Sequence, residues 1–584
     1  MYDMEREKNM LRWVEEEPRM SPAEMDRYYS DYAGGGYLAV LENRAYPIHD
    51  VLRFPARWLE YSDPYTLRAE GNPGEYYAFQ LAVFAKEDIG ALTVGWEGNL
   101  PQPDCFNLGG IGCDGKPFSK TVSPVPGRVQ PLWFGFSLPE SGCSSVEGTL
   151  ILKPEKAEAT TLHIHISVEG DVLADCGDSE PWRHSRLRWL NSAIAQDDEI
   201  TAPFAPLTRK GSTISGLGHS VILGKNGLPE QLTSAFSLTV EGISLRAREI
   251  LAAPIGFGAP EQEAALTRPL SFTEEKPGII RWESEWNSGD IAVSCEGKME
   301  YDGYQEYALA VEALEDTELD DLALRIPYRA DCAKDWMGMG KQGGLRAGEL
   351  DWQWDESRNQ DTLWMGDVNA GLMVRLKDDN YRKPFMLIYY RYHPLVMPEG
   401  WDNGGRGSCT VRQRGSIVPF EAHSGKVVLR KGQSLSFRFD LSPTPVKPID
   451  KAEHWLDHYY HAVPGDLAQV SAKGANVINI HHGNSLNPYI NYPFFETERV
   501  AELVEECHKN ALRLKLYYTV KEITVRTPEF WAFKSLGDEI VPTTWEIGES
   551  FQGSIPYADD WLREQLTDGY MTAWRQKVEN GEYQ

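Results

Sequence analysis

The arrangement of apolar residues changes in kind near residue 471, and this change limits the folds open to the chain. Between residues 36 and 445, apolar and polar residues alternate over short runs that glycine and proline interrupt, as is typical of β-strands with one buried face. Beyond residue 471, short apolar runs flank a stretch with helical periodicity. The sequence therefore predicts a multidomain β plus α/β protein.

The β-rich region is long enough for two domains. In residues 36–175, the segments EYYAFQLAVFA and TLHIHISVEG alternate apolar and polar side chains, which predicts one antiparallel β-sandwich. In residues 206–445, an Asn-Gly pair at 226–227 and an Asp-Gly pair at 302–303 predict hairpin turns, and the length favours a large two-sheet supersandwich. The other predicted segments are a helical N-terminal segment at 1–35, a connector at 176–205 and a linker at 446–470.

A βαβ unit is predicted after the linker. GANVINIHHGN holds a short apolar run, TERVAELVEECHKN follows with apolar residues at helical spacing, and LRLKLYYTV supplies a second strand. Residues 471–584 are fewer than the roughly 200–250 that a complete (β/α)8 barrel needs. We therefore expect two antiparallel β-sandwich-like domains followed by an incomplete (β/α)8 TIM-type barrel, with a smaller complete α/β domain as the alternative.

The composition argues against several partners. The chain has 58 Lys and Arg against 87 Asp and Glu, a formal net charge of −29, so we expect binding neither to nucleic acid nor to anionic membranes. No apolar run is long enough for a transmembrane helix, and the N-terminal sequence lacks the features of a secretory signal, which predicts a cytoplasmic protein. The eight cysteines include no CxxC pair, and we expect no metal or other cofactor.

Four long segments, in order along the chain, carry a resemblance to a known family. They are ADCGDSEPWRHSRLRWLNSAIAQDDEITAPFAP (174–206), IYYRYHPLVMPEGWDNGGRG (388–407), VINIHHGNSLNPYINYPFF (477–495) and LKLYYTVKEITVRTPEFWAFKSLGDEI (514–540). They resemble large bacterial proteins related to glycoside hydrolase family 123. The resemblance implies β-sandwich domains ahead of a (β/α)8 catalytic barrel, and the family's named members are β-N-acetylgalactosaminidases acting on glycosphingolipid-type glycans. It also implies an adjacent Asp-Glu catalytic pair on a later barrel strand than those of this chain.

Glycoside hydrolysis requires two acidic functions beside the scissile bond. In its substrate-assisted form, the 2-acetamido oxygen of the sugar attacks the anomeric carbon, one carboxylate orients that amide, and its neighbour protonates the leaving oxygen. Adjacent Asp-Glu pairs occur at 198–199, 355–356 and 538–539. The first two lie outside the α/β region, and the third follows Gly537 in a predicted helix C-terminal turn. All three are predicted to be surface or structural pairs, and the catalytic residues are not assigned.

Polar residues at the ends of the two predicted parallel strands are the candidate substrate-binding residues. Parallel strands deliver their C-terminal residues to one edge, where barrel enzymes bind substrate. On the first strand Asn479 and His481 share one face, and on the second Tyr517 belongs to the polar face. The predicted substrate-binding set is Asn479, His481, His482, Asn484, Tyr517, Thr519 and Glu522. The alternative is that these side chains only satisfy buried loop backbone.

Two further groups of residues have alternative interpretations. The connector concentrates Trp182, Arg183 and Arg186, which could contact a glycan or pack between domains, and packing is the simpler interpretation. Trp352, Trp354 and Trp364 lie in a loop-like acidic stretch and could form a carbohydrate platform or cap a sandwich.

The resemblance thus implies the front portion of a glycoside hydrolase-like protein of bacterial type, whose partner is a carbohydrate. The type it implies is a β-N-acetylhexosaminidase or β-N-acetylgalactosaminidase with a substrate-assisted retaining mechanism. On this prediction the chain lacks its catalytic acidic pair. The alternative from another class is a non-catalytic glycan-binding or scaffolding β-sandwich protein.

Overall fold

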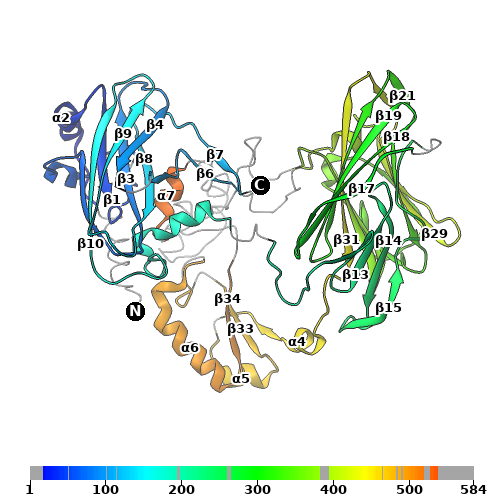
Figure 1. Ribbon diagram of the computed structural model, residues 1–584. Coiled ribbons are helices and arrows are strands. Elements are labelled where there is room, and N and C mark those ends of the chain that lie inside the picture. The colour runs from blue at the N-terminus through cyan, green and yellow to red at the C-terminus, as the bar shows by residue number, and fades with distance from the viewer. Residues whose placement is uncertain are drawn as a thin grey trace. The chain divides into compact units, whose positions relative to one another are not determined.

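The computed structural model divides the chain into two compact units, Met1–Gln196 with Asp457–Gln584 and Asp197–Leu456 (Figure 1). The structure describes residues 17–49, 51–99, 102–112, 115–193, 198–259, 265–381, 394–462, 464–481, 484–487, 491–518 and 527–536. Within these ranges, the helices are too short or too polar to span a bilayer. The seven cysteines in the same ranges are free thiols, and four of them are buried.

The first unit begins with helix α2 (Pro22–Tyr32) and a sandwich of two four-stranded sheets. Ser21 caps α2, because its hydroxyl accepts from the backbone N–H of Glu24 while the Glu24 carboxylate accepts from the backbone N–H of Ser21. One sheet has the order β1-β3-β8-β5 and the other β2-β10-β9-β4. The strands are β1 (Tyr37–Asn43), β2 (Thr66–Gly71), β3 (Tyr76–Ala85), β4 (Leu92–Gly98), β5 (Asp104–Cys105), β8 (Val129–Ser137), β9 (Ser145–Pro154) and β10 (Thr160–Val168); β6 (Gly109–Ile111) and β7 (Pro117–Ser119) form a separate hairpin.

The predicted sandwich over 36–175 differs from the structure in two respects. Strand β2 pairs with β10 in parallel, with Leu67 opposite Ile164, so the second sheet is not wholly antiparallel. Strand β3 is buried on both faces instead of one. Its second face is covered because Ala78 packs with Phe530 from the C-terminal part of the chain, while Ala82 packs with Tyr28 of α2.

The second unit is an antiparallel β-structure around one continuous core. A nine-stranded sheet has the order β17-β18-β19-β20-β31-β27-β26-β23-β24, and two five-stranded sheets have the orders β16-β22-β29-β28-β25 and β11-β12-β13-β14-β15. The predicted two-sheet supersandwich is therefore a three-sheet structure, with a small additional pair, β21-β30.

The strands of this unit are β11 (Thr208–Lys210), β12 (Thr213–Ser215), β13 (His219–Leu223), β14 (Pro229–Phe236), β15 (Ile243–Glu249), β16 (Gly256–Gly258), β17 (Ala265–Glu275), β18 (Ile279–Ser288), β19 (Ile291–Glu300), β20 (Gln305–Ala313), β21 (Thr317–Leu319), β22 (Ala323–Arg329), β23 (Asp335–Gly338), β24 (Lys341–Leu345), β25 (Leu350–Gln353), β26 (Thr362–Asp367), β27 (Ala370–Lys377), β28 (Ser408–Val411), β29 (Ile417–His423), β30 (Val427–Leu429) and β31 (Ser434–Thr444). Both predicted hairpin turns are confirmed. Gly227 joins β13 to β14 with φ 76°, and Gly303 joins β19 to β20 with φ 92°. Only glycine adopts these angles without strain.

Stability of the second unit should fall as the pH drops below the ordinary pKa of histidine, about 6.5. His219 of β13 is 4% exposed, with Nε2 2.5 Å from the Pro445 carbonyl oxygen and Nδ1 buried without a partner. Burial of the ring lowers the pKa of His219. Hydrogen bonds to the backbone of Pro445 and Thr233 and the negative charge of Asp302 act in the opposite direction, but their effect is smaller. Because the unfolded chain then binds a proton that the folded unit does not, the free energy of unfolding declines with falling pH. Urea unfolding at pH 7 and pH 5 should show this decline, and His219→Gln should reduce it; an equal pH dependence in both proteins would contradict the assignment.

The α/β part contains three parallel strands in the order β32-β33-β34. Its elements are β32 (Tyr459–Tyr460), α5 (Leu467–Ala472), β33 (Val477–Ile480), η5 (Pro493–Glu496), α6 (Thr497–Lys509), β34 (Arg513–Leu516) and α7 (Phe530–Ser535), with α4 (Lys451–Leu456) preceding them. The predicted βαβ unit is confirmed as β33-α6-β34. Residues 446–470, predicted as a linker, instead contain α4, β32 and the start of α5.

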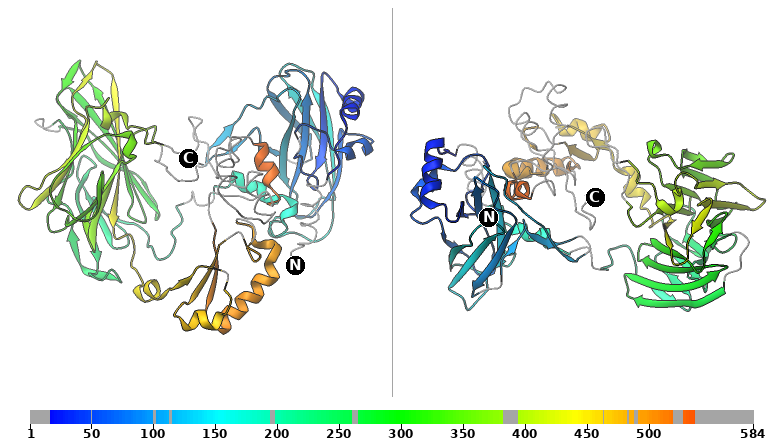
Figure 2. Two further views of the ribbon diagram at one scale, coloured as in Figure 1. Left: turned by 180° about the vertical axis from the view of Figure 1, so that it is seen from behind. Right: turned by 90° about the horizontal axis from the view of Figure 1, so that it is seen from above.

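Helix α7 packs on the N-terminal sandwich, whose strands lie far from it in sequence (Figure 2). Phe530 and Phe533 lie in one buried cluster with Tyr76 and Trp133 of the sandwich. Immediately before α7, Glu529 forms a two-point ion pair with Arg186, whose Nε and Nη2 each lie 2.7 Å from a carboxylate oxygen. The first unit is thus built from both ends of the chain.

Candidate functional site

The three parallel strands present one apolar and one polar face. Ile478 and Ile480 of β33 and Leu514 and Leu516 of β34 pack in one cluster with residues of α5 and α6. The alternate residues therefore face away from these helices. This is the division of faces that the sequence predicts, with the apolar side on the helices and the polar side on the barrel interior.

On the polar face, two aromatic rings from neighbouring strands stack at the carboxyl ends. The ring centroids of His481 and Tyr517 are 4.3 Å apart, with 17° between the ring planes. The backbone N–H of Tyr517 donates to the Ile480 carbonyl at 2.8 Å, which continues the strand pairing beyond β34 and holds the two rings together. The predicted juxtaposition of His481 and Tyr517 is therefore present in the structure.

His461, from the end of β32, extends this group. Its ring lies 5.8 Å from that of His481, and its Nδ1 lies 2.5 Å from the side-chain nitrogen of Asn479. In this arrangement the Asn479 amide N–H donates and Nδ1 accepts, so a neutral His461 carries its proton on Nε2. Asn479 is 8% exposed, and its Oδ1 has no hydrogen-bond partner among the residues that the structure describes.

The loop after β33 is organised by Asn484. Its side-chain oxygen accepts from the backbone N–H groups of Leu486 and Asn487 at 2.9 and 3.1 Å, and its side-chain nitrogen donates to the His481 carbonyl at 2.6 Å. All three contacts are with loop backbone, so this side chain positions the loop, as in the alternative that the sequence left open. In the same loop Asn487 is completely buried, and within the described ranges neither its Oδ1 nor its Nδ2 has a partner.

Three of the predicted site residues, His482, Thr519 and Glu522, lie outside the described residues. The Asp538-Glu539 pair also lies outside them. The set that the structure brings together is therefore Asn479, His481 and Tyr517, with Asn484 supporting the loop behind them.

Sequence reasoning missed His461 and Asn487. His461 follows a strand of only two residues, Tyr459–Tyr460, which is too short for a period-two pattern to reveal. Asn487 precedes a proline in a loop, where asparagine is common for backbone reasons alone. The one available signal was for Asn487, which follows closely after the end of the predicted strand in GANVINIHHGN, whereas His461 lies in the predicted linker 446–470.

The other candidate residues have structural roles. Arg183 pairs with the buried Glu75 at 2.9 Å, and Arg186 pairs with Glu529, so the connector packs within the first unit. Trp352 is buried in the core and cannot belong to an exposed platform, while the half-buried Trp364 donates from Nε1 to the Thr444 hydroxyl at 2.8 Å. Two of the adjacent Asp-Glu pairs lie in the second unit and also have structural contacts. The Asp355 carboxylate caps the short helix η4 (Glu356–Arg358), and a carboxylate oxygen of Asp198 lies 3.7 Å from Nζ of Lys276.

The strand-edge group of His461, Asn479, His481, Asn487 and Tyr517 combines ring faces with amide and imidazole hydrogen-bonding groups. Buried amide atoms without partners are rare in proteins, and each costs about 1–3 kcal/mol if it stays unpaired. A ligand with hydroxyl or amide groups would satisfy them. Within the described ranges, no three His, Cys, Asp or Glu side chains are placed to hold a metal ion.

Two family models match the chain, each in a region already described. The model of the glycoside hydrolase 123 third domain matches residues 207–445, and that of the glycoside hydrolase 123 TIM-barrel domain matches residues 450–582. Together they cover most of the second unit and the whole α/β part. The chain belongs to the glycoside hydrolase family 123-related proteins. The parallel strands β32, β33 and β34 of this family 123-related protein lie within the TIM-barrel match.

Solved structures show only weak likeness to the whole chain. A family 123 glycoside hydrolase from Clostridium perfringens, studied for glycolipid glycan hydrolysis, is 10% identical with a TM-score of 0.17, over 23% of this chain and 28% of that chain. An α-mannosidase from Enterococcus faecalis V583 is 9% identical with a TM-score of 0.26, over 73% and 43%. An aldose epimerase homologue from C. elegans is 8% identical with a TM-score of 0.24, over 42% and 99%.

The chain spans about a quarter of the length of the Clostridium perfringens enzyme. A comparison with curated proteins found no match.

Proposed function

We propose that this chain supplies the sugar-binding strand edge of a glycoside hydrolase of the β-N-acetylhexosaminidase type. The observation that carries the proposal is a set of buried amide atoms with no partner among the described residues, namely Asn479 Oδ1 and both Asn487 Oδ1 and Nδ2, near in sequence to the His481–Tyr517 stack. Saccharide hydroxyls both donate and accept hydrogen bonds, so they can satisfy amide oxygen and nitrogen atoms alike. The faces of sugar rings also pack on flat aromatic side chains such as the Tyr517 ring.

The position of the group supports the same proposal. Barrel enzymes bind substrate at the carboxyl ends of their parallel strands. His461, His481 and Tyr517 directly follow β32, β33 and β34, while Asn479 is the penultimate residue of β33 and Asn487 lies in the loop after it. In the proposed substrate-assisted retaining reaction, the sugar's own acetamido oxygen attacks the anomeric carbon. The strand-edge group then holds the sugar ring in place, because its amide groups can form hydrogen bonds with the sugar and its aromatic rings can pack against it. Proton transfer to the leaving oxygen is assigned to a carboxyl group, as in glycosidases generally.

Calorimetric titration of the full chain with N-acetylgalactosamine tests the binding role. We expect His481→Ala to weaken binding about tenfold or more, because it removes half of the stacked pair and one hydrogen-bonding ring; a tenfold change corresponds to about 1.4 kcal/mol. His508→Ala is the matched control, since His508 is an exposed histidine on α6. Equal affinities in the two variants would contradict the proposal.

A hydrolysis assay separates this proposal from a glycan-binding or scaffolding role. Release of nitrophenol from para-nitrophenyl N-acetyl-β-galactosaminide, reduced in the His481→Ala variant, would show that the chain holds its own catalytic carboxyl groups and would contradict the expectation that it lacks the acidic pair. Saccharide binding without nitrophenol release would favour the glycan-binding role instead.

A further inference from the structure

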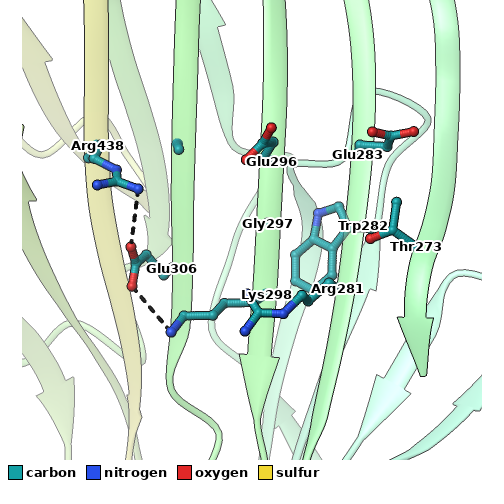
Figure 3. A pocket seen from close by; sticks show the side chains of 10 residues that line it. Thr273, Arg281, Trp282, Glu283, Glu296, Gly297, Lys298, Glu306 and Arg438 are labelled. Atoms are coloured by element: carbon teal, nitrogen blue, oxygen red, sulfur yellow. Dashed lines mark ion pairs between the residues drawn. The ribbon is translucent and has the colours of Figure 1, made fainter. Parts of the chain in front are cut away.

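A hollow of about 330 Å³ lies on the face of the nine-stranded sheet that points away from the core (Figure 3). On β18, β19 and β20, the residues that alternate with the buried core positions line it. Its charged lining consists of Arg281, Glu283, Glu296, Lys298, Glu306 and Arg438. It belongs entirely to the second unit, and none of its residues is part of the strand-edge group.

Strand register explains the shape of the hollow. Lys298 lies opposite both Arg281 and Glu306, and these long side chains form one row across the sheet. In the next row, Ala308 lies between Glu296 on β19 and Arg438 on β31. An alanine flanked by longer side chains leaves a depression above its methyl group.

Glu306 is the central charged group, between Arg438 and Lys298 (Figure 3). Its carboxylate oxygens lie 3.8 Å from Arg438, 3.5 Å from Lys298 and 3.9 Å from Lys377. Burial acts to raise its pKa, but these three cations outweigh burial and hold the pKa below the usual value. The carboxylate is therefore ionised, and its ion pairs are all longer than a direct hydrogen bond.

Other charged residues of the lining form close ion pairs with residues outside it. Arg281 lies 2.8 Å from Glu274, Glu283 lies 2.8 Å from Arg268, and Lys298 lies 2.9 Å from Glu300. The longer distances around Glu306 leave space between its carboxylate and the surrounding cations.

Two other lining groups have unused hydrogen-bonding capacity. Glu296 is exposed and makes no ion pair or hydrogen bond with any residue in the described ranges. The Nε of Arg438 is buried without a partner. The hollow therefore offers carboxylate acceptors and guanidinium and ammonium donors within one space.

We propose that this hollow binds a neutral saccharide, as a second carbohydrate site separate from the strand edge. Its lining balances three cations, Arg281, Lys298 and Arg438, against three anions, Glu283, Glu296 and Glu306. A ligand with a net charge of either sign meets repulsion from half of these groups, whereas neutral hydroxyl groups pair with both halves. Hydrogen bonds between hydroxyl groups and ionised side chains are also stronger than those between neutral groups.

Titration of the full chain with N-acetyllactosamine, a neutral disaccharide, tests this proposal. We expect Ala308→Phe to weaken binding at least tenfold, because a phenyl ring would fill the depression above the alanine. Ala310→Phe is the matched control: Ala310 lies on the same strand and the same face but outside the lining, and we expect affinity within twofold of the unchanged protein. Glu296→Gln, at an exposed position that no core packing depends on, should weaken binding several-fold without affecting the fold.

Four outcomes would overturn the proposal. The first is that the disaccharide does not bind, and the second is that the Ala308→Phe and Ala310→Phe variants bind it with equal affinity. The third is that His481→Ala abolishes binding while Ala308→Phe does not. The fourth is that the sialylated disaccharide binds at least as tightly as the neutral one. The third outcome would leave the strand edge as the sole saccharide site, so failure of this proposal is distinguishable from failure of the proposed function. Binding that Ala308→Phe abolishes and His481→Ala leaves intact would support the second site.

Discussion

Glu75→Gln is expected to lower the free energy of unfolding of the first unit by about 3–5 kcal/mol. Glu75 is fully buried between two arginines: it forms a direct ion pair with Arg44, and its other oxygen lies 2.9 Å from Arg183. The Arg44 side chain is only 4% exposed, so without the carboxylate its charge would stay buried and unpaired. Removing one partner of a buried ion pair costs far more than the pair contributes, because the desolvated partner charge remains.

Glu180→Gln is the matched control for this change. Glu180 also contacts Arg183, at 2.5 Å, but its side chain is 28% exposed, and partly exposed pairs of this kind contribute at most about 1 kcal/mol. Hydrogen exchange of the amides of β3, measured by mass spectrometry, reports the stability of the unit. If Glu75→Gln changed the free energy of unfolding by no more than Glu180→Gln, the pairing described here would be wrong.

Phe530→Ala is expected to release α7 from the N-terminal sandwich. Phe530 is fully buried among Tyr76, Trp133 and Phe106 of the sandwich, and truncating a buried phenylalanine costs about 3–5 kcal/mol. A helix of six residues has little stability of its own, so it depends on these contacts and on the Arg186–Glu529 pair. We expect residues 527–536 to exchange their amide hydrogens rapidly in the variant, while the strands of the second unit keep the protection of the unchanged protein.

Lys534→Ala is the matched control for Phe530→Ala. Lys534 is an exposed residue of the same helix, and its truncation should change amide exchange only slightly. Unchanged protection of residues 527–536 in Phe530→Ala would show that the sandwich does not hold this helix.

Local pattern predicted those parts of the fold that depend on neighbouring residues. Alternating residues predicted β10, in which Leu162, Ile164 and Ile166 are buried, and the Asn-Gly and Asp-Gly pairs predicted two hairpins. The parallel pairing of β2 with β10 could not be predicted, because it joins strands about a hundred residues apart, and periodicity carries no information on partners.

The burial of both faces of β3 has the same cause. The alternation in EYYAFQLAVFA predicts one buried face, but α2 and α7 cover the other, and α7 comes from more than 400 residues away. The alanines at positions 78 and 82 are small and apolar, so they allow a helix to pack on this face. Alanine is also common on exposed strand faces, so the sequence alone does not predict the contact.

At the candidate site, strand direction had predictive value and loop chemistry did not. Two parallel strands in register bring the residues after their ends together, which placed His481 beside Tyr517. The role of Asn484 depends on a loop conformation that spacing alone does not define. The contribution of His461 depends on a third strand too short to be recognised from its sequence.

The most direct test of the sugar-binding strand edge is a crystal structure of the full chain grown with N-acetylgalactosamine. The account predicts density for a sugar ring at the carboxyl ends of β32, β33 and β34, with ligand oxygens within hydrogen-bonding distance of the Asn479 and Asn487 amides and the ring face near Tyr517. A strand edge without ligand, with both amides still unpaired or bonded only to protein, would contradict it.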